Sequence, residues 1–197
     1  MKAAVVYESM FGNTKRIAEA VADGLALSVC RPEVVVIPVA DAPSDDLLDL
    51  DLLVVGGPTH LRRMTSRRTR EMRVGSRARL PSGGPGDPEE WARVAATGVR
   101  EWLAGLSTLA VGRRAAAFDT RLRYSPAAGA APLIARRLRS RGYRVDAVPR
   151  GFFVESAYGP LANGESERAK AWGTALGDQL WDRPCVLSHP GPVPNPD

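Results

Sequence analysis

Hydroxyl and amide side chains gather near the start of the chain, in residues 7–14. Ser9, Asn13 and Thr14 can each donate a hydrogen bond to an anion, and Gly12 permits a close backbone approach. An apolar run precedes the segment and a helical pattern follows it from about Lys15. The segment therefore predicts a turn between a strand and a helix N-terminus, where free backbone N–H groups and the helix dipole favour a phosphate. On this motif alone, an ordinary capped turn is an equally good interpretation.

Two other polar segments follow apolar runs, and we expect both to be loops. Residues 58–64 come after the run 52–55, and residues 119–124 come after the run 115–118. In doubly wound α/β sheets, ligands bind outside the carboxyl ends of the strands. We therefore expect residues 8–14, 58–64 and 119–124 to form one site.

Arginine dominates the basic residues, and the formal net charge is +5. Residues 62–79 contain eight arginines and a single acid, Glu71. Three interpretations are open: a solvated helical face, a surface for an anionic partner, and a nucleic-acid surface. The partner would be a nicotinamide dinucleotide phosphate or an acidic protein. Nucleic acid is not expected, because the arginines lack interleaved aromatic residues and a recognisable reading motif.

Several other chemistries find no support in the sequence. His60 and His189 are the only histidines, and Cys30 lies far from Cys185, so no metal site is expected and the thiols are expected to be reduced. No catalytic triad or Walker loop is present, and we assign no catalytic residue. No apolar run has the length of a membrane span, and the N-terminus lacks a signal-peptide layout, so we expect a cytoplasmic protein with no membrane contact.

The remaining patterns supply the elements that position these segments. Strands are expected at residues 3–6, 34–39, 52–55 and 115–118, and a fifth at 145–148 and 152–154, interrupted at 149–151. Helices are expected from Asn13, over 87–106, from either Ser125 or Ala131 to a stop at Gly142, and over 164–181. Unalternating apolar strands are buried on both faces. The prediction is one α/β domain, residues 1–183, with a doubly wound five-stranded parallel sheet and helices on both faces, followed by a proline-rich disordered tail, residues 184–197.

With these elements in place, the chain resembles the flavodoxin-like family, including its quinone-reductase branch and the flavodoxin domains of flavodiiron proteins. Residues 7–14 resemble the family's phosphate loop, and residues 57–64 resemble its second, flavin-contacting loop. Residues 161–176 resemble its closing helix. The resemblance implies a flavin mononucleotide (FMN) cofactor. The residues that it implies for FMN binding are Ser9, Met10, Phe11, Gly12, Asn13, Thr14, Pro58, Thr59, His60, Leu61, Asp119, Thr120, Arg121 and Tyr124.

The chain also departs from the family pattern. Phe11 stands where flavodoxins often place a threonine, and Leu61, Arg62 and Arg63 replace an aromatic residue, a glycine and an asparagine of the quinone-reductase branch. Tyr124 is the only aromatic residue in the segments expected to face the flavin, and both a stacking role and a solvent-exposed loop position are open for it.

The resemblance implies an FMN-binding oxidoreductase or electron-transfer protein, of the type that reduces quinones with NAD(P)H or that exchanges electrons with an acidic partner. A second interpretation stays open: a flavodoxin-fold interaction or anion-binding module that has lost its flavin and uses residues 62–79. An oligomer is compatible with both, because residues 67–86 are long enough to reach a neighbouring subunit.

Overall fold

A five-stranded parallel sheet forms the centre of the computed structural model, which describes residues 1–42, 49–60, 63–77, 96–108, 113–123 and 129–180. The strands are β1 (Lys2–Tyr7), β2 (Glu33–Pro38), β3 (Leu52–His60), β5 (Arg114–Leu122) and β6 (Arg150–Val154), in the spatial order β2-β1-β3-β5-β6. A sixth, two-residue strand, β4 (Arg63–Met64), pairs antiparallel with the end of β3. The predicted α/β fold with a five-stranded parallel sheet is confirmed.

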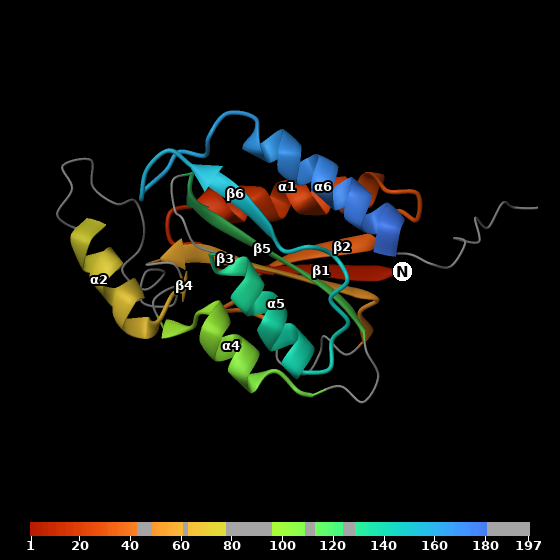
Figure 1. Ribbon diagram of the computed structural model, residues 1–197, viewed down its shortest axis with the longest axis horizontal. Helices are drawn as coiled ribbons and strands as arrows, with labels where there is room; N and C mark the ends of the chain where they lie inside the picture. The colour runs from red at the N-terminus through yellow and green to blue at the C-terminus, as the bar shows by residue number, and fades with distance from the viewer. Residues whose placement is uncertain (43–48, 61–62, 78–95, 109–112, 124–128, 181–197) are drawn as a thin grey trace, which may run out of the picture.

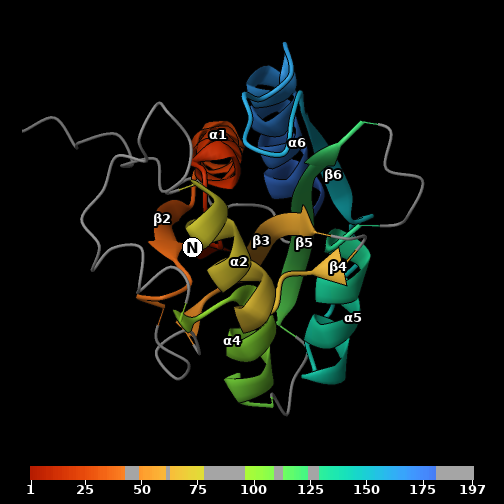
Figure 2. The ribbon, with the colours of Figure 1, turned by 90° about the vertical axis from the view of Figure 1, so that its left-hand side faces the viewer.

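Helices cover both faces of the sheet (Figure 1). Helices α1 (Asn13–Leu27) and α6 (Glu165–Leu180) lie on one face, and α4 (Val99–Gly105) and α5 (Ala131–Ser140) lie on the other. Helix α2 (Arg67–Arg77) stands apart from both layers, in front of the edge where the strands end (Figure 2).

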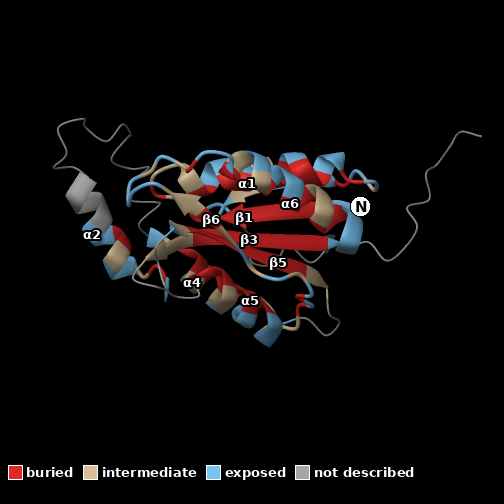
Figure 3. Ribbon diagram, turned by 45° about the horizontal axis from the view of Figure 1, so that its top comes forward, coloured by how far each residue is buried: buried red, intermediate tan, exposed pale blue. Residues whose placement is uncertain are grey.

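Each face of the sheet has its own apolar core, and the central strands between the two cores are buried on both sides (Figure 3). On the α1 and α6 side, the rings of Phe118, Phe152 and Trp172 contact one another edge to face, with centroids 6.0 to 6.3 Å apart. On the other side, Leu103, Ile134 and Leu138 are fully buried. Burial of this kind stabilises the fold by about 25 cal/mol per Å² of apolar surface.

Helices α1 and α6 approach each other closely. A Cβ atom at Gly24 would lie 2.0 Å from the carbonyl oxygen of Lys170. Only glycine permits this distance between the two backbones, so Gly24 fixes how α6 packs on the helix that starts at the polar turn.

Three expected elements differ in detail from the structure, and a fourth had two expected starts. Strand β2 is an edge strand and is not buried on both faces, since Val35 is 43% exposed. Residues 145–148 are not a strand: β6 begins at Arg150, and only a single bridge joins Arg144 to β5. The described part of the expected helix 87–106 is interrupted, because Thr97 and Gly98 are not helical and α4 begins at Val99. Helix α5 begins at Ala131, the second of the two expected starts.

Two further expectations need comment. Cys30 is disulfide-bonded, so the expectation of reduced thiols is wrong for this residue. The proline-rich tail, residues 184–197, lies outside the described residues. Among the described residues, no helix has both the length and the apolar character that a membrane crossing requires.

Candidate functional site

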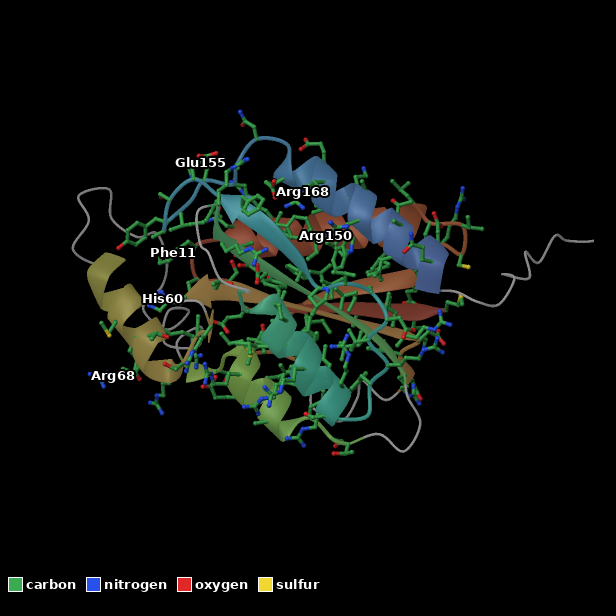
Figure 4. The ribbon with its side chains drawn as sticks, in the orientation of Figure 1. Phe11, His60, Arg68, Arg150, Glu155 and Arg168 are labelled. Atoms are coloured by element: carbon green, nitrogen blue, oxygen red, sulfur yellow. The ribbon has the colours of Figure 1, made fainter. Side chains whose placement is uncertain are left out.

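A cavity of about 270 Å³ opens where β1, β3, β5 and β6 end. It brings together residues from all three polar segments and from parts of the chain that the sequence did not single out. The lining residues are Ser9, Met10, Phe11, Asn13, Thr14, Pro58, Thr59, His60, Thr65, Thr69, Thr120, Arg121, Leu122, Val154 and Ala157. Figure 4 shows Phe11 and His60 at this end of the molecule, beside α2.

The turn after β1 is shaped to receive an acceptor of hydrogen bonds. Gly12 is the N-cap of α1 and has φ +82°, a left-handed conformation that favours glycine, and a Cβ atom there would meet nothing within 4 Å. The Ser9 Oγ atom is buried and has no hydrogen-bond partner among the described residues. Buried hydroxyls in folded proteins almost always have a partner. A hydrogen-bond acceptor bound in the turn would supply the missing partner of Ser9.

A buried hydrogen bond joins the turn to the opposite wall of the cavity. The Thr14 and Thr120 Oγ1 atoms lie 2.8 Å apart, and both side chains are almost fully buried. Helix α1 and strand β5 are thereby held together at the cavity floor.

The second polar segment is a hairpin and not a simple loop. Pro58, Thr59 and His60 continue β3, and Thr59 and His60 pair with Met64 and Arg63 of β4. The expectation of a loop over 58–64 was wrong because strand pairing continues past the apolar run. Thr59 Oγ1 accepts a hydrogen bond of 2.8 Å from the backbone N–H of Ala130. Leu61 lies outside the described residues.

The first half of the third polar segment, residues 119–124, also belongs to a strand. Asp119, Thr120 and Arg121 belong to β5, which corrects the expected loop over 119–124, because their backbones pair with β3 and β6. Thr120 and Arg121 line the cavity, whereas Tyr124 lies outside the described residues.

Asp119 has a structural role beneath the cavity. Its side chain is fully buried and is not among the residues that line the cavity. Its Oδ2 atom accepts a hydrogen bond of 2.8 Å from the N–H of Ala131 at the start of α5, and Oδ1 lies 3.6 Å from Arg121 Nε. Burial raises the pKa of Asp119, although the Ala131 N–H group and Arg121 oppose the rise. Asp119 therefore anchors α5 through Oδ2, while Oδ1 is buried without a hydrogen-bond partner among the described residues, and its role in cofactor binding stays a prediction.

The connection after β6 forms a wall of the cavity that the sequence analysis missed. Val154 and Ala157 line the cavity. The Tyr158 ring contacts the Phe11 ring edge to face at 5.1 Å, and Asn13 Nδ2 donates to the Tyr158 carbonyl oxygen at 3.4 Å. These residues follow the carboxyl end of a predicted strand, so the rule that selected the other three segments could have found them.

Behind the cavity, a buried charged network fixes the hairpin. Glu8 is 2% exposed, accepts a hydrogen bond from the Thr65 hydroxyl and accepts another of 2.9 Å from the Val99 N–H. Burial raises the pKa of Glu8, against the effects of the two hydrogen bonds and of the nearby Arg70 guanidinium. These bonds tie the end of β1 to β4 and α4.

Arg70 belongs to the same network. Its side chain is fully buried, lies 3.1 Å from Glu101 Oε2 and donates to Thr65 Oγ1 at 3.2 Å. Arg70 is therefore not part of a solvated helical face. It has a structural role in the first turn of α2. Thr65 and Thr69, which line the cavity, were not predicted because the arginines around them dominated the sequence pattern.

Solved structures with the same architecture are flavodoxins and proteins that contain a flavodoxin-like unit. A flavodoxin from the domain Archaea has a TM-score of 0.57 and 24% identity, covering 91% of this chain and 99% of its own. Flavodoxin 2 from Bacillus cereus has a TM-score of 0.58 and 19% identity, covering 89% and 97%. A WrbA-like flavodoxin protein from Agrobacterium tumefaciens has a TM-score of 0.53 and 16% identity, covering 91% and 96%. The flavodiiron protein from Giardia intestinalis matches at 22% identity and a TM-score of 0.55 over 91% of this chain, but over only 36% of its own.

The fold is therefore flavodoxin-like, as the sequence motifs predicted. The sequence itself matches the family model described as flavodoxin over residues 5–63, which include the turn after β1 and most of the β3–β4 hairpin. No curated protein matches the chain.

Proposed function

We propose that the protein binds FMN in this cavity and acts as an oxidoreductase or electron-transfer protein through it. The observation that carries the proposal is the buried hydroxyl of Ser9, in the turn at the head of α1, for which the described part of the chain offers no hydrogen-bond partner. A phosphate accepts hydrogen bonds on every oxygen, so it suits a donor that the protein alone leaves unsatisfied.

The residues present fit the cofactor. The phosphate would be held by Ser9, Asn13 and Thr14 and by backbone N–H groups of the turn, with the positive end of the α1 dipole directed at it. The neutral donors match a site that relies on hydrogen bonds more than on ion pairs. The ring system would lie against Pro58, Thr59 and His60 on one side and Thr120 and Arg121 on the other.

When bound, FMN supplies the hydride and electron chemistry. The protein's own part is to bind, orient and enclose the cofactor. The Thr14–Thr120 hydrogen bond and the Phe11–Tyr158 contact hold two walls of the cavity together and limit the access of water. We include in the proposal two kinds of redox partner: NAD(P)H with a quinone-type acceptor, which the resemblance to the quinone-reductase branch supports, and an acidic redox protein.

A flavin titration tests the proposal. Purified protein is titrated with FMN and separately with riboflavin, which lacks the phosphate, while flavin fluorescence and absorbance are recorded. We expect FMN to bind more tightly than riboflavin. The Ser9→Ala variant should weaken FMN binding about tenfold, because a hydrogen bond to a charged group contributes about 1.5 kcal/mol. Its riboflavin affinity should stay the same.

The result that opposes the proposal is equally clear. If FMN neither loses fluorescence nor shifts in absorbance on mixing, the cavity does not serve a flavin. The flavodoxin-fold interaction module would then be the better interpretation. If FMN and riboflavin bind equally, a flavin is bound but its phosphate does not occupy the turn.

A further inference from the structure

Arginines stand on three elements around the cavity: β4, α2 and the end of β5. Arg63 lies in β4 directly across from the cavity residue His60, and Arg67 and Arg68 lie in the first turn of α2 beside the cavity residue Thr69. Arg121 lines the cavity at the end of β5, and Arg123 follows two residues later. We call these five residues the rim arginines. All except Arg121, whose side chain is 23% exposed, are exposed.

The rim keeps a surplus of positive charge. Among the described residues, Arg63, Arg68 and Arg123 form no ion pair. Arg67 pairs with Glu71 at 2.8 Å, and the partner of Arg121 is the buried Asp119. Exposed cations around a concave site produce a positive potential that attracts an anionic partner before contact.

Phe153 helps to hold one side of the rim in place. The guanidinium carbon of Arg123 lies 5.2 Å from the Phe153 ring centroid, and that of Arg121 lies 6.0 Å from it. An aromatic face orients a guanidinium group without neutralising its charge. These two arginines are thus ordered in advance of binding, which lowers the entropy lost when a partner docks.

We propose that an acidic protein surface docks on the rim arginines, over the mouth of the cavity. This inference rests on the proposed function, because it names the kind of partner that would reach a flavin held there. The arrangement fits a broad surface: the charges lie on β4, on α2 and at the end of β5, which come from distant parts of the chain, and they are mostly exposed.

Two other anionic ligands fit the geometry less well. A dinucleotide phosphate is bound by donors that converge on it, whereas the rim cations are spread over β4, the first turn of α2 and the end of β5. A nucleic-acid backbone follows a continuous positive groove, whereas Glu71 on α2 and Glu155 after β6 interrupt the positive surface, and Figure 4 shows Arg68 and Glu155 on well-separated elements.

The test uses fluorescently labelled poly-L-glutamate of about 20 residues as the acidic probe. Its binding to the full chain is measured by anisotropy, with and without FMN, beside poly-L-lysine and single-stranded DNA of similar length. The test variant is Arg68→Glu with Arg123→Glu, one substitution on α2 and one after β5. The matched control is Arg136→Glu with Arg137→Glu, which makes the same charge change at two exposed positions on α5.

We expect poly-L-glutamate to bind and poly-L-lysine not to bind. The rim variant should lose about tenfold or more in affinity, and the control variant no more than about twofold, because charge pairs act through local complementarity as well as net charge. Binding should weaken steeply between 0.02 and 0.5 M salt, as the screening length falls from roughly 20 Å to below 5 Å. With FMN bound, saturating peptide should slow FMN release, because the peptide covers the opening.

Three outcomes overturn the inference. Equal losses in the rim and control variants would show attraction by net charge alone. DNA binding more than about tenfold tighter than the peptide, with the same loss in the rim variant, would favour nucleic acid. Displacement of the peptide by NADPH at micromolar concentration would assign the rim to a dinucleotide. Because the peptide is also tested without FMN, absence of flavin binding and absence of peptide binding are read separately.

Discussion

Gly12 offers a direct test of whether a phosphate occupies the turn after β1. Replacing it with alanine adds one methyl group to a residue with φ +82°. A non-glycine residue in left-handed geometry costs roughly 1 to 2 kcal/mol. No steric clash adds to this, because a Cβ atom would meet nothing within 4 Å. For a chain of this size, we expect a fall in melting temperature of about 2 to 8 °C.

Gly164 supplies the matched control. It has φ +78°, a Cβ atom there would also meet nothing within 4 Å, and it immediately precedes α6 as Gly12 precedes α1. It lies before α6 and not in the turn after β1. The variants Gly12→Ala and Gly164→Ala should therefore lose similar amounts of stability.

The two variants should differ in flavin binding. Gly12 lies between the cavity residues Phe11 and Asn13, so a methyl group there alters the turn whose N–H groups we propose to hold the phosphate. FMN affinity should fall about tenfold or more, which corresponds to at least 1.36 kcal/mol. Urea unfolding measures the stability of each variant, and fluorescence titration below 10 °C, where both are folded, measures FMN affinity. Equal FMN affinities for the two variants would refute a phosphate at Gly12.

Two further predictions concern stability. The raised pKa of Glu8 means that the folded state holds its proton to higher pH than the unfolded state, so stability falls as pH rises above about 4.3 towards the folded value. Glu8→Gln removes this dependence, and the melting temperature of the parent should fall relative to that of the variant between pH 4 and 7; a relative gain would contradict the assignment. Gly24→Ala should destabilise the fold by about 1 to 3 kcal/mol in urea unfolding, because α1 and α6 must move apart to admit the methyl group. An unchanged midpoint would show that the helices separate freely.

The sequence predicted most strands because their apolar runs are long and buried. It missed where β3 and β5 end, since the apolar signal stops at Val55 and Phe118 while backbone pairing continues through polar residues. The opposite error occurred at residues 145–148, where an apolar run predicted a strand that the structure does not form. Val145 is apolar and buried, but it packs in the core beside Leu138 without strand pairing on either side.

Part of the site could be predicted from one rule: ligands bind outside the carboxyl ends of parallel strands, where short polar segments follow the apolar runs. The Glu8 network was not, because it joins residues that are remote in sequence: the Val99 N–H group that bonds Glu8 lies 91 positions away. Arg70 shows the same limit. Nothing in a run of arginines distinguishes the one that folding buries from its exposed neighbours, since the difference comes from Glu101 and Thr65.

The contact between Asn13 and Tyr158 has a consequence for how the site comes into being during synthesis. The turn after β1 emerges from the ribosome early, but the wall that covers it is separated from it by 145 positions and follows the last strand. Sheet order adds to the delay. Among the described strands, β6 pairs with β5 alone, and β5 is itself the fourth of the parallel strands to be made. A nascent chain thus carries an open, incomplete turn until nearly all of the described fold has been translated, so the proposed FMN site is complete only when the domain is complete.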